Sequence, residues 1–341
     1  MKHAAITGIA GQDGTYLARW LLRKDYEVHG LLRSPFDREE ARLIRRFGIE
    51  DTAKIHWHNG SLEDSFSLVR FLKASQPEEI YHLAGVTDSR QSFNVPEQSV
   101  IAITLGTLHL LEAAREVCAG ARIFLASSCE VFGVPAQMPQ NENTLKQPVT
   151  PYGIAKLAAD LFAQLHREKY NQFVSVGILY NHESPLRPPN YISSRVARAV
   201  AAIKQGRLHE LHLADLNSER DWGDARDFVR GFWLTLQAKT PDNYLFASGA
   251  PHSVADLVDC AFRFVGLDYR EFVKARDDTA SLQQIVASLC GNPQKAEADL
   301  AWKREWSFQE TIQDMVQAEL ENRTEIERAD PLPKRKAMHK I

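Results

Sequence analysis

TGIAGQDG, residues 7–14, follows a short apolar run, His3–Thr7, and leads into a helix-like pattern. In this context Gly8 permits a tight turn, Gly11 lets backbone amides approach a pyrophosphate, and Gly14 lets the helix pack closely on the strand. The spacing is Gly-x-x-Gly-x-x-Gly. A glycine triplet alone is weak evidence, but its place after the first strand strengthens it. We predict a dinucleotide-binding turn here, with a plain strand–helix turn as the alternative.

Short apolar runs alternate with longer amphipathic stretches as far as residue 180, which is typical of a parallel α/β sheet. The expected strands are His3–Thr7, Glu27–Leu32, Lys54–His58, Glu79–Leu83, Arg122–Ala126 and Phe173–Leu179. The expected helices include Thr15–Arg23, Ser65–Ala74, Val100–Val117 and Ile154–Lys169. Each crossover has room for a helix, so we predict a Rossmann-like, doubly wound parallel sheet of the α/β class.

The rhythm of the sequence changes after Tyr180, where Pro185, Pro188 and Pro189 mark an irregular loop. We therefore expect a nucleotide-binding domain at residues 1–180, to which some later segments return. Residues 181–322 are expected to form mainly a smaller C-terminal α/β lobe that binds substrate. Residues 323–341 read as a charged, mobile tail.

Composition excludes several classes of protein. The 341 residues carry a formal net charge of -3, which does not favour nucleic acid or an anionic membrane. No apolar run is long enough to span a bilayer. The four cysteines include no Cys-x-x-Cys pair, so no metal site is expected, and free thiols suggest a reducing compartment. We expect a soluble, cytoplasmic protein.

The end of the second expected strand bears on the choice of cofactor. An acidic residue there would bind the ribose 2′-hydroxyl of NAD, but this chain offers Leu32-Arg33-Ser34. Arg33 can pair with a 2′-phosphate, so NADP is predicted over NAD. The alternative is a solvent-facing arginine.

Tyr152 and Lys156 form a Tyr-x-x-x-Lys pattern at the start of an expected helix, directly after Pro151. Residues four apart share a helix face, so the ammonium can lie near the phenol and lower its pKa. Such a tyrosine could take a proton from a sugar hydroxyl.

The fifth expected strand ends in Ser127-Ser128-Cys129-Glu130, at an edge where this kind of sheet places chemistry. Ser128 can donate a hydrogen bond to a developing oxyanion. The Glu130 carboxylate could remove a carbon-bound proton from a keto sugar, and a surface glutamate is the alternative.

Together these motifs resemble the extended short-chain dehydrogenases/reductases. Further stretches resemble the GDP-mannose 4,6-dehydratase family, and the resemblance covers residues 2–316. These stretches are GIAGQDG at 8–14, GTL at 106–108 before LLEA at 110–113, NHESP at 181–185 and RDWGDARD at 220–227.

The resemblance implies a redox-neutral dehydration of a GDP-sugar. Tyr152 would take the C4 hydroxyl proton while NADP+ takes the C4 hydride, and the resulting ketone would acidify C5. Glu130 would remove the C5 proton, the C6 hydroxyl would leave as water, and the hydride would return to C6. The product would be a 4-keto-6-deoxy sugar nucleotide.

The resemblance also implies which residues line the site. The catalytic group would be Ser128, Glu130, Tyr152 and Lys156. The cofactor would contact Gly8, Ile9, Ala10, Gly11, Gln12, Asp13, Arg33, Ser61, Leu62, Leu83, Ala84, Gly85, Thr87, Tyr152, Lys156, His182 and Arg187. The substrate would contact Thr87, Ser128, Glu130, Tyr152, Asn181 and Arg220.

The chain departs from the family pattern at several positions. Ser61 stands where the family usually has an adenine-binding aspartate, and Gln98 replaces a tyrosine that usually helps bind the cofactor. Leu282-Gln283 fall near an Arg-Pro pair that normally grips the substrate's phosphates. Loss of a bidentate donor leaves a GDP-activated manno-heptose as a second candidate substrate.

Other functions remain open at this point. The stretch HLAG at 82–85 also resembles 4-keto-sugar-nucleotide reductases, and an epimerase of the same fold is a further alternative. Those reductases need the tyrosine and the lysine but not Glu130, so the carboxylate favours dehydration. A non-catalytic NADP-binding protein is the remaining alternative.

The long apolar faces of Val100–Val117 and Ile154–Lys169 bear on assembly. In the family their equivalents pair between subunits, so a homodimer or homotetramer is expected. The alternative is that these faces only cover the sheet.

Overall fold

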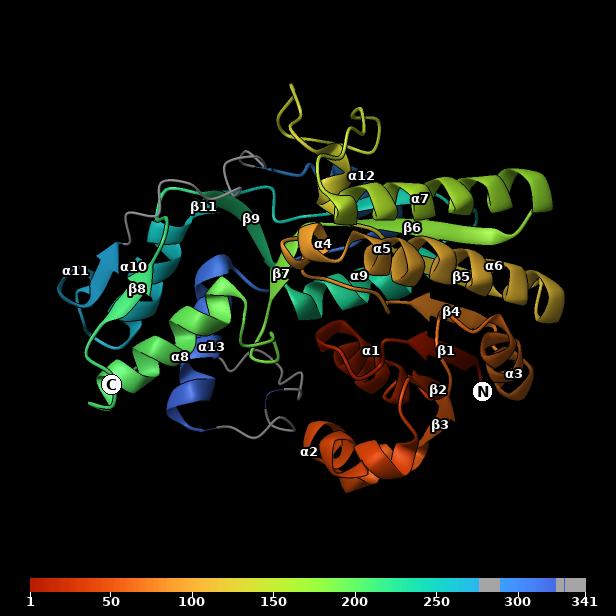
Figure 1. Ribbon diagram of the computed structural model, residues 1–341, viewed down its shortest axis with the longest axis horizontal. Helices are drawn as coiled ribbons and strands as arrows, with labels where there is room; N and C mark the ends of the chain where they lie inside the picture. Colours follow the sequence, from red (N-terminus) through yellow and green to blue (C-terminus); the bar gives the residue numbers. More distant parts are fainter. Residues whose placement is uncertain (276–288, 323–327, 329–341) are drawn as a thin grey trace.

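The computed structural model describes residues 1–275, 289–322 and 328. A seven-stranded parallel sheet forms its centre, in the order β10-β6-β5-β4-β1-β2-β3 (Figure 1). Its strands are β1 (His3–Thr7), β2 (Glu27–Leu32), β3 (Ile55–Asn59), β4 (Glu79–His82), β5 (Arg122–Ala126), β6 (Phe173–Leu179) and β10 (Asn243–Phe246). The α/β class and the doubly wound parallel sheet are thus confirmed. The seventh strand, β10, was not among the expected strands and comes from the second half of the chain.

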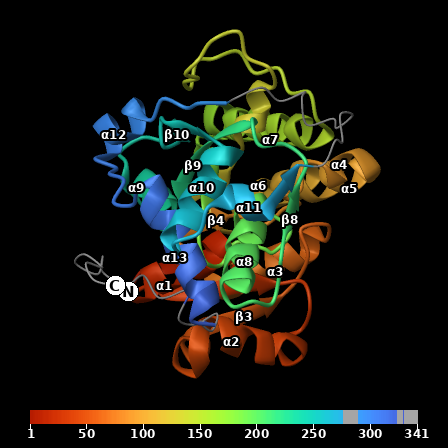
Figure 2. The same cartoon turned by 90° about the vertical axis from the view of Figure 1, so that its left-hand side faces the viewer.

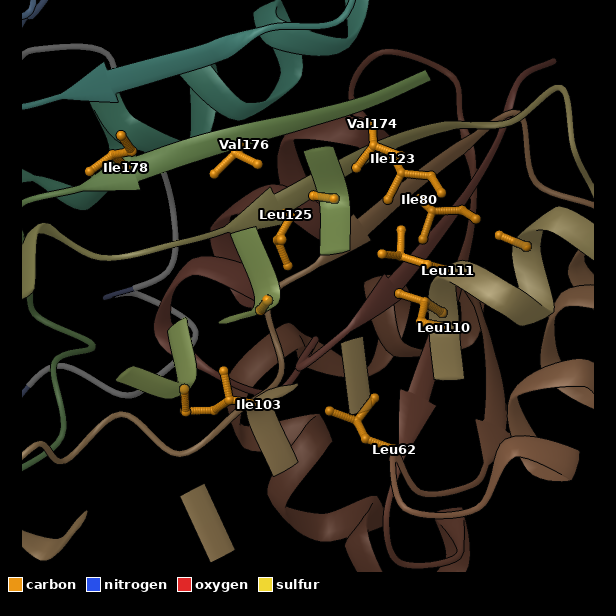
Figure 3. Packing of buried hydrophobic residues seen from close by; sticks show 14 of the residues in the cluster. Leu62, Ile80, Ile103, Leu110, Leu111, Ile123, Leu125, Val174, Val176 and Ile178 are labelled. Atoms are coloured by element: carbon orange, nitrogen blue, oxygen red, sulfur yellow. The ribbon is translucent and has the colours of Figure 1, made fainter. Parts of the chain in front are cut away.

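Helices cover both faces of this sheet and enclose two hydrophobic cores. One face carries α1 (Gln12–Leu22), α2 (Phe36–Lys54), α9 (Ala225–Gln237) and α12 (Gln294–Leu300). The other carries α3 (Ser65–Ser75), the π-helical turn η1 (Val100–Leu105), α6 (Gly106–Val117) and α7 (Pro151–Tyr170). Figure 3 shows this second core, where side chains of β4, β5 and β6 meet Leu110 and Leu111 of α6. The expected helix Val100–Val117 is therefore split between η1 and α6.

A smaller lobe lies beside the carboxyl ends of the strands (Figures 1 and 2). Its small sheets are β11-β9-β7 and β12-β8. Their strands are β7 (Asn181–Glu183), β8 (Leu211–Leu213), β9 (Glu219–Asp224), β11 (Pro251–Ser253) and β12 (Val273–Ala275). Its helices are α8 (Ile192–Lys204), α10 (Val254–Phe264), α11 (Tyr269–Phe272) and α13 (Phe308–Leu320). Residues of α8, α10 and α13 share a core of their own, so the lobe has an independent hydrophobic centre.

Segments from the second half of the chain return to the main sheet. Phe228 and Phe232 of α9, Phe246 of β10 and Trp302 pack in the core beneath α1. A half-buried ion pair also links the two parts, because Arg226 of α9 binds Asp314 of α13 at 2.9 Å. The lobe is thereby fixed beside the carboxyl edge of the sheet.

Most of the expected charged tail, residues 323–341, lies outside the described residues. Its described member, Arg328, forms an ion pair of 2.6 Å with Glu319 of α13. Among the described helices, none combines the length and apolar character needed to cross a membrane.

Candidate active site

The glycine turn lies at the carboxyl edge of the sheet, against the end of β4. Gly8 has φ +76°, and a Cβ there would lie 2.8 Å from the Ala84 amide nitrogen and 2.9 Å from the Leu83 carbonyl carbon. Only glycine can therefore occupy this left-handed, crowded position. Close approach brings the predicted pyrophosphate turn next to Leu83, Ala84 and Gly85.

Helix α1 begins at Gln12 with Gly11 as its N-cap, and no side chain caps it. The N–H groups of a first helical turn have no partner within the helix and favour an anion. Ile9 is fully buried beneath the turn and Ala10 is half-buried at its surface. This arrangement fits the pyrophosphate of a dinucleotide.

Asp13 joins the glycine turn to β7. Its carboxylate accepts hydrogen bonds from His182 Nε2 at 2.9 Å and from Gln12 Nε2 at 3.0 Å. His182 Nδ1 also donates to the Tyr180 carbonyl at 2.7 Å, so both ring nitrogens face acceptors. Burial alone would lower the pKa of His182, but the charge of Asp13 and its hydrogen bond raise it. The Asp13 side chain is thus engaged within the protein, which leaves its backbone N–H for a pyrophosphate.

Arg187 lies at the lobe side of the same region. Its Nε is 3.1 Å from Glu183 Oε2, and its guanidinium stacks on Tyr191 at 3.7 Å from the ring centroid. The Tyr191 hydroxyl donates to Thr87 Oγ1 at 2.9 Å. Thr87 and Arg187 are therefore held together through Tyr191, between the end of β4 and the lobe.

The residues predicted to bind the adenosine half of the cofactor differ in whether other residues of the protein already hold them. Arg33 is exposed directly after β2, and within the described residues no hydrogen bond or ion pair holds its guanidinium. Ser61 is tied into its own loop, because its amide donates to Ser67 Oγ at 3.0 Å. Leu62 is buried, and its carbonyl accepts from His109 Nδ1 at 2.9 Å.

Glu130 occupies the short 3-10 turn η2 (Cys129–Phe132) that follows β5. Its Oε2 accepts hydrogen bonds from Ser89 Oγ at 2.6 Å and from Thr150 Oγ1 at 2.8 Å. Within the described residues, its Oε1 has no hydrogen-bond partner. Burial raises the pKa of Glu130, and the two hydroxyl groups partly oppose that shift. One carboxylate oxygen is anchored and the other is left to act as a base.

Two features place α7 beside Glu130. Thr150 caps the helix by accepting from the Gly153 amide at 2.9 Å, and Pro151 occupies its first turn. A Cβ on Gly153 would lie 2.7 Å from the Glu130 carbonyl oxygen, so glycine permits this contact. The Thr150 hydroxyl thus caps α7 and also donates a hydrogen bond to the Glu130 carboxylate. The position of the start of α7 therefore helps to fix the position of Glu130.

Tyr152 and Lys156 are both buried on α7, and Lys156 Nζ lies 5.8 Å from the Tyr152 ring centroid. The motif predicted that a nearby Lys156 would lower the pKa of the phenol, whereas in this arrangement the net shift is upward. Lys156 donates instead to the Ala126 carbonyl at 2.6 Å, and burial and then the Glu130 charge raise the pKa of Tyr152. The Ser128 hydroxyl acts in the opposite direction. Burial also lowers the pKa of Lys156 to about 8.

Two of the residues predicted to meet substrate, Arg220 and Asn181, come from the lobe. Arg220 in β9 lies close enough to Glu130 for each charge to affect the other's pKa, and burial lowers the pKa of Arg220. Asn181 begins β7 and pairs with Trp222 of β9. The predicted substrate and catalytic residues therefore meet at one edge of the sheet. The departure at 282–283 lies outside the described residues.

Several residues at the site were not predicted for it from the sequence, among them Ser89, Thr150 and Arg46. Ser89 and Thr150 hold Glu130, and Arg46 of α2 donates to the Ala10 carbonyl of the glycine turn at 2.7 Å. Thr150 carried a usable signal, because threonine before proline is typical of a helix N-cap. Ser89 and Arg46 carried none, since their roles depend on how loops and α2 fold back.

Comparison with known proteins shows the family. A sequence profile described as GDP-mannose 4,6 dehydratase matches residues 5–315. A GDP-mannose 4,6-dehydratase of Sinorhizobium fredii (strain HH103) is 37% identical, covering 94% of this chain and 97% of that protein. The human GDP-mannose 4,6 dehydratase is 35% identical, covering 93% and 91%.

Solved structures show the same fold at lower sequence identity. DesIV, a dTDP-glucose 4,6-dehydratase from Streptomyces venezuelae with NAD and TYD bound, superposes with a TM-score of 0.81 at 22% identity. It covers 95% of this chain and 98% of that one. RMD from Pseudomonas aeruginosa, complexed with NADPH, gives a TM-score of 0.77 at 20% identity, covering 94% and 100%. On its sequence match, the chain belongs to the GDP-mannose 4,6-dehydratase family.

Proposed function

We propose that this protein converts GDP-mannose to GDP-4-keto-6-deoxymannose, a hydro-lyase reaction with internal return of hydride. The family membership supports the substrate and the reaction class. The observation that carries the proposal is Glu130, a half-buried carboxylate with one oxygen anchored by two hydroxyl groups and the other free. A reductase of the same fold needs no such base.

The elimination step rests on Glu130. Its raised pKa makes it a stronger base than an exposed carboxylate, while Ser89 and Thr150 keep its charged form accessible and fix its direction. We assign it to remove the C5 proton of a 4-keto sugar. The same proton leaves with the C6 hydroxyl as water.

Tyr152 would take the C4 hydroxyl proton, with Ser128 donating to the oxygen at which charge develops. Lys156 would orient the nicotinamide ribose and supply positive charge near the phenol. When bound, the nicotinamide cofactor would accept the C4 hydride and return it to C6. The C5 proton and the C6 hydroxide form the one water lost. The proton taken from the C4 hydroxyl is balanced by the proton that C5 regains after the hydride has returned to C6.

An isotope experiment tests this assignment. GDP-mannose deuterated at C4 should yield a product deuterated at C6, with no deuterium left in free reduced cofactor. In deuterated water the product should gain deuterium at C5. Deuterium retained at C4 in a product lacking water would contradict the proposed route.

We further propose NADP as the cofactor. Support comes from Arg33, whose exposed guanidinium follows β2 and has no partner among the described residues. No carboxylate follows β2 at that position to bind a 2′-hydroxyl. We also propose that the cofactor contacts the residues predicted from the sequence, which are Gly8–Asp13, Ser61, Leu62, Leu83–Thr87, His182 and Arg187. The cytoplasmic location stays a prediction.

We propose a homodimer formed through η1, α6 and α7. Large apolar side chains are exposed on these adjacent helices, among them Leu105 at 40%, Ile154 at 54% and Leu161 at 57%. Such a surface suits a second copy of the chain. Leu161→Glu should lower the mass measured by sedimentation to that of a monomer, whereas Leu208→Glu in the lobe should not. A wild-type monomer would contradict the proposal.

A further inference from the structure

Three histidines and a glutamate gather where β1, β2 and β3 begin, far from the glycine turn. His3 of β1 pairs with Glu27 of β2, and His29 of β2 pairs with His56 of β3. Side chains alternate along a strand, so these four residues point to the same face of the sheet. These three strands are neighbours at one end of the seven-stranded sheet, in the lower part of Figure 1.

All three imidazole groups turn their Nε2 atoms toward the Glu27 carboxylate. The distances are 3.2 Å from His29 and 3.3 Å from His56 to Oε1, and 3.5 Å from His3 to Oε2. The ligand atoms of His3, Glu27 and His29 all lie within 4.8 Å of one another. Neighbouring ligands of a tetrahedral zinc ion are roughly 3.3 Å apart, because each bond is about 2 Å long. A small inward movement of His3, Glu27 and His29 would meet that geometry, and His56, which lies outside this group of three, would join as the fourth ligand after a larger rotation of its exposed ring.

Two of the ring nitrogens are presented as metal ligands rather than as hydrogen-bond donors. His3 Nδ1 lies 3.1 Å from the Ser75 carbonyl oxygen, which can only accept, so Nδ1 carries the proton. A neutral His3 then presents a bare lone pair at Nε2. His29 is only 4% exposed, and its Nε2 has no hydrogen-bond partner even though Glu27 is near, because the direction is wrong. A cation between these atoms and the carboxylate would satisfy both.

The surroundings also resemble those of a metal site. His29 Nδ1 lies 3.0 Å from His58 Nε2, and the His58 ring packs edge-on against Phe71 of α3. Metal-binding histidines usually use their second nitrogen in this way, which fixes the ring. Ser75 is the last residue of α3, and a helix C-terminus favours positive charge.

We propose that His3, Glu27, His29 and His56 bind one zinc ion that joins the first three strands of the sheet. Imidazole and carboxylate ligands suit zinc, and the half-exposed His56 side chain leaves a route for the ion to enter. The site is about 13 Å along β1 from the glycine turn. Its role is therefore to stabilise the fold and not to take part in the sugar chemistry.

The test is a zinc titration of the full-length protein after removal of metal, in competition with a coloured chelator. Wild type should bind one equivalent, and His3→Gln and Glu27→Gln should each weaken binding about tenfold or more. His56→Gln should also weaken zinc binding. Because this side chain is half-exposed, its replacement should leave the fold intact, so that weaker binding cannot be explained by misfolding. His252→Gln in the lobe is the matched control and should bind as wild type does. Cobalt(II) should give the visible absorption bands of four-coordination in wild type and in His252→Gln, but not in His3→Gln.

Zinc should also raise the unfolding temperature of wild type and of His252→Gln, but not that of His3→Gln. The proposal is overturned if wild type retains no zinc against the chelator. It is equally overturned if His3→Gln, Glu27→Gln and His56→Gln all bind zinc with wild-type affinity. None of these readouts depends on sugar turnover.

Discussion

The two edges of the central sheet carry different kinds of polar cluster. At the carboxyl edge, Glu130 accepts hydrogen bonds from two hydroxyl groups on one oxygen, and Arg220 lies close enough to lower its pKa. At the amino edge, three imidazole Nε2 atoms surround Glu27, and those of His3 and His29 have lone pairs to offer. A carboxylate that faces hydroxyl donors is prepared for proton transfer, whereas one that faces lone pairs is prepared for a cation.

The largest expected effect separates the two edges. Glu130→Gln keeps the shape of the side chain but removes the base, so kcat should fall by about 10²–10⁴-fold. Zinc affinity should not change. Steady-state kinetics and the zinc titration measure the two quantities on one preparation. Glu168→Gln, exposed on α7, is the control, and near-normal kcat in Glu130→Gln would remove the carboxylate from the mechanism.

Arg33→Ala probes the adenosine end of the same carboxyl edge. Removing a charged contact to a 2′-phosphate should weaken NADP binding by roughly 10–100-fold and leave NAD binding nearly unchanged. Calorimetric titration with both cofactors gives the ratio. Arg70→Ala on α3 is the matched control. If the affinities for NADP and NAD fell by the same factor, Arg33 would not be a contact to the 2′-phosphate.

His82 makes the carboxyl edge sensitive to acid. It is buried between the hydroxyl groups of Thr7 and Thr107, and burial lowers its pKa to about 3. In the unfolded chain the imidazole of His82 is protonated as the pH falls below about 6.5, whereas in the folded chain it stays neutral down to about pH 3. The free energy of unfolding is therefore highest above pH 6.5 and decreases as the pH falls toward 3. Between pH 7 and about pH 5 the loss should be about 2 kcal/mol.

Urea unfolding of the metal-free protein at the two pH values measures that loss. His82→Gln should show a smaller difference between them, whatever its absolute stability. An identical difference in wild type and variant would place the acid sensitivity elsewhere, for example at the buried His29, whose pKa is also lowered.

Ser89→Ala should give the smallest effect. Its hydroxyl lowers the pKa of Glu130, so its removal should raise that pKa and move the acid limb of the kcat profile to higher pH. At the optimum, kcat should fall only about three- to tenfold, the net contribution of one ordinary hydrogen bond, because Thr150 still holds the same carboxylate oxygen. A pH profile of kcat distinguishes this positioning role from simple loss of structure, which would lower kcat without shifting the limb.

The sequence carried much of the fold and some of the site. Apolar periodicity located β1, β2, β5 and β6 at their observed bounds, because buried parallel strands are continuous apolar runs between turns. It did not predict β10, which pairs with β6 only after the chain has built part of the lobe. Pairing between distant segments leaves no local pattern.

The same limit applies to the chemistry. Glu130 and Tyr152 could be predicted because each belongs to a short motif in the local sequence. Ser89 could not be predicted, because it contacts Glu130 from a separate loop. Lys156 matched its motif, yet its ammonium binds the Ala126 carbonyl, a contact that spacing along a helix does not reveal. The histidines at the amino edge meet only through strand register, so the absence of a Cys-x-x-Cys pair said nothing about them.

The most direct test of the proposed dehydratase is the mass of GDP-mannose after incubation with the purified protein and a catalytic amount of NADP+. We expect a product that is lighter than GDP-mannose by one water. More GDP-mannose should be converted than there is cofactor present, and no net NADPH should form. Unchanged GDP-mannose, or NADPH consumed on a 4-keto sugar with no loss of water, would contradict it.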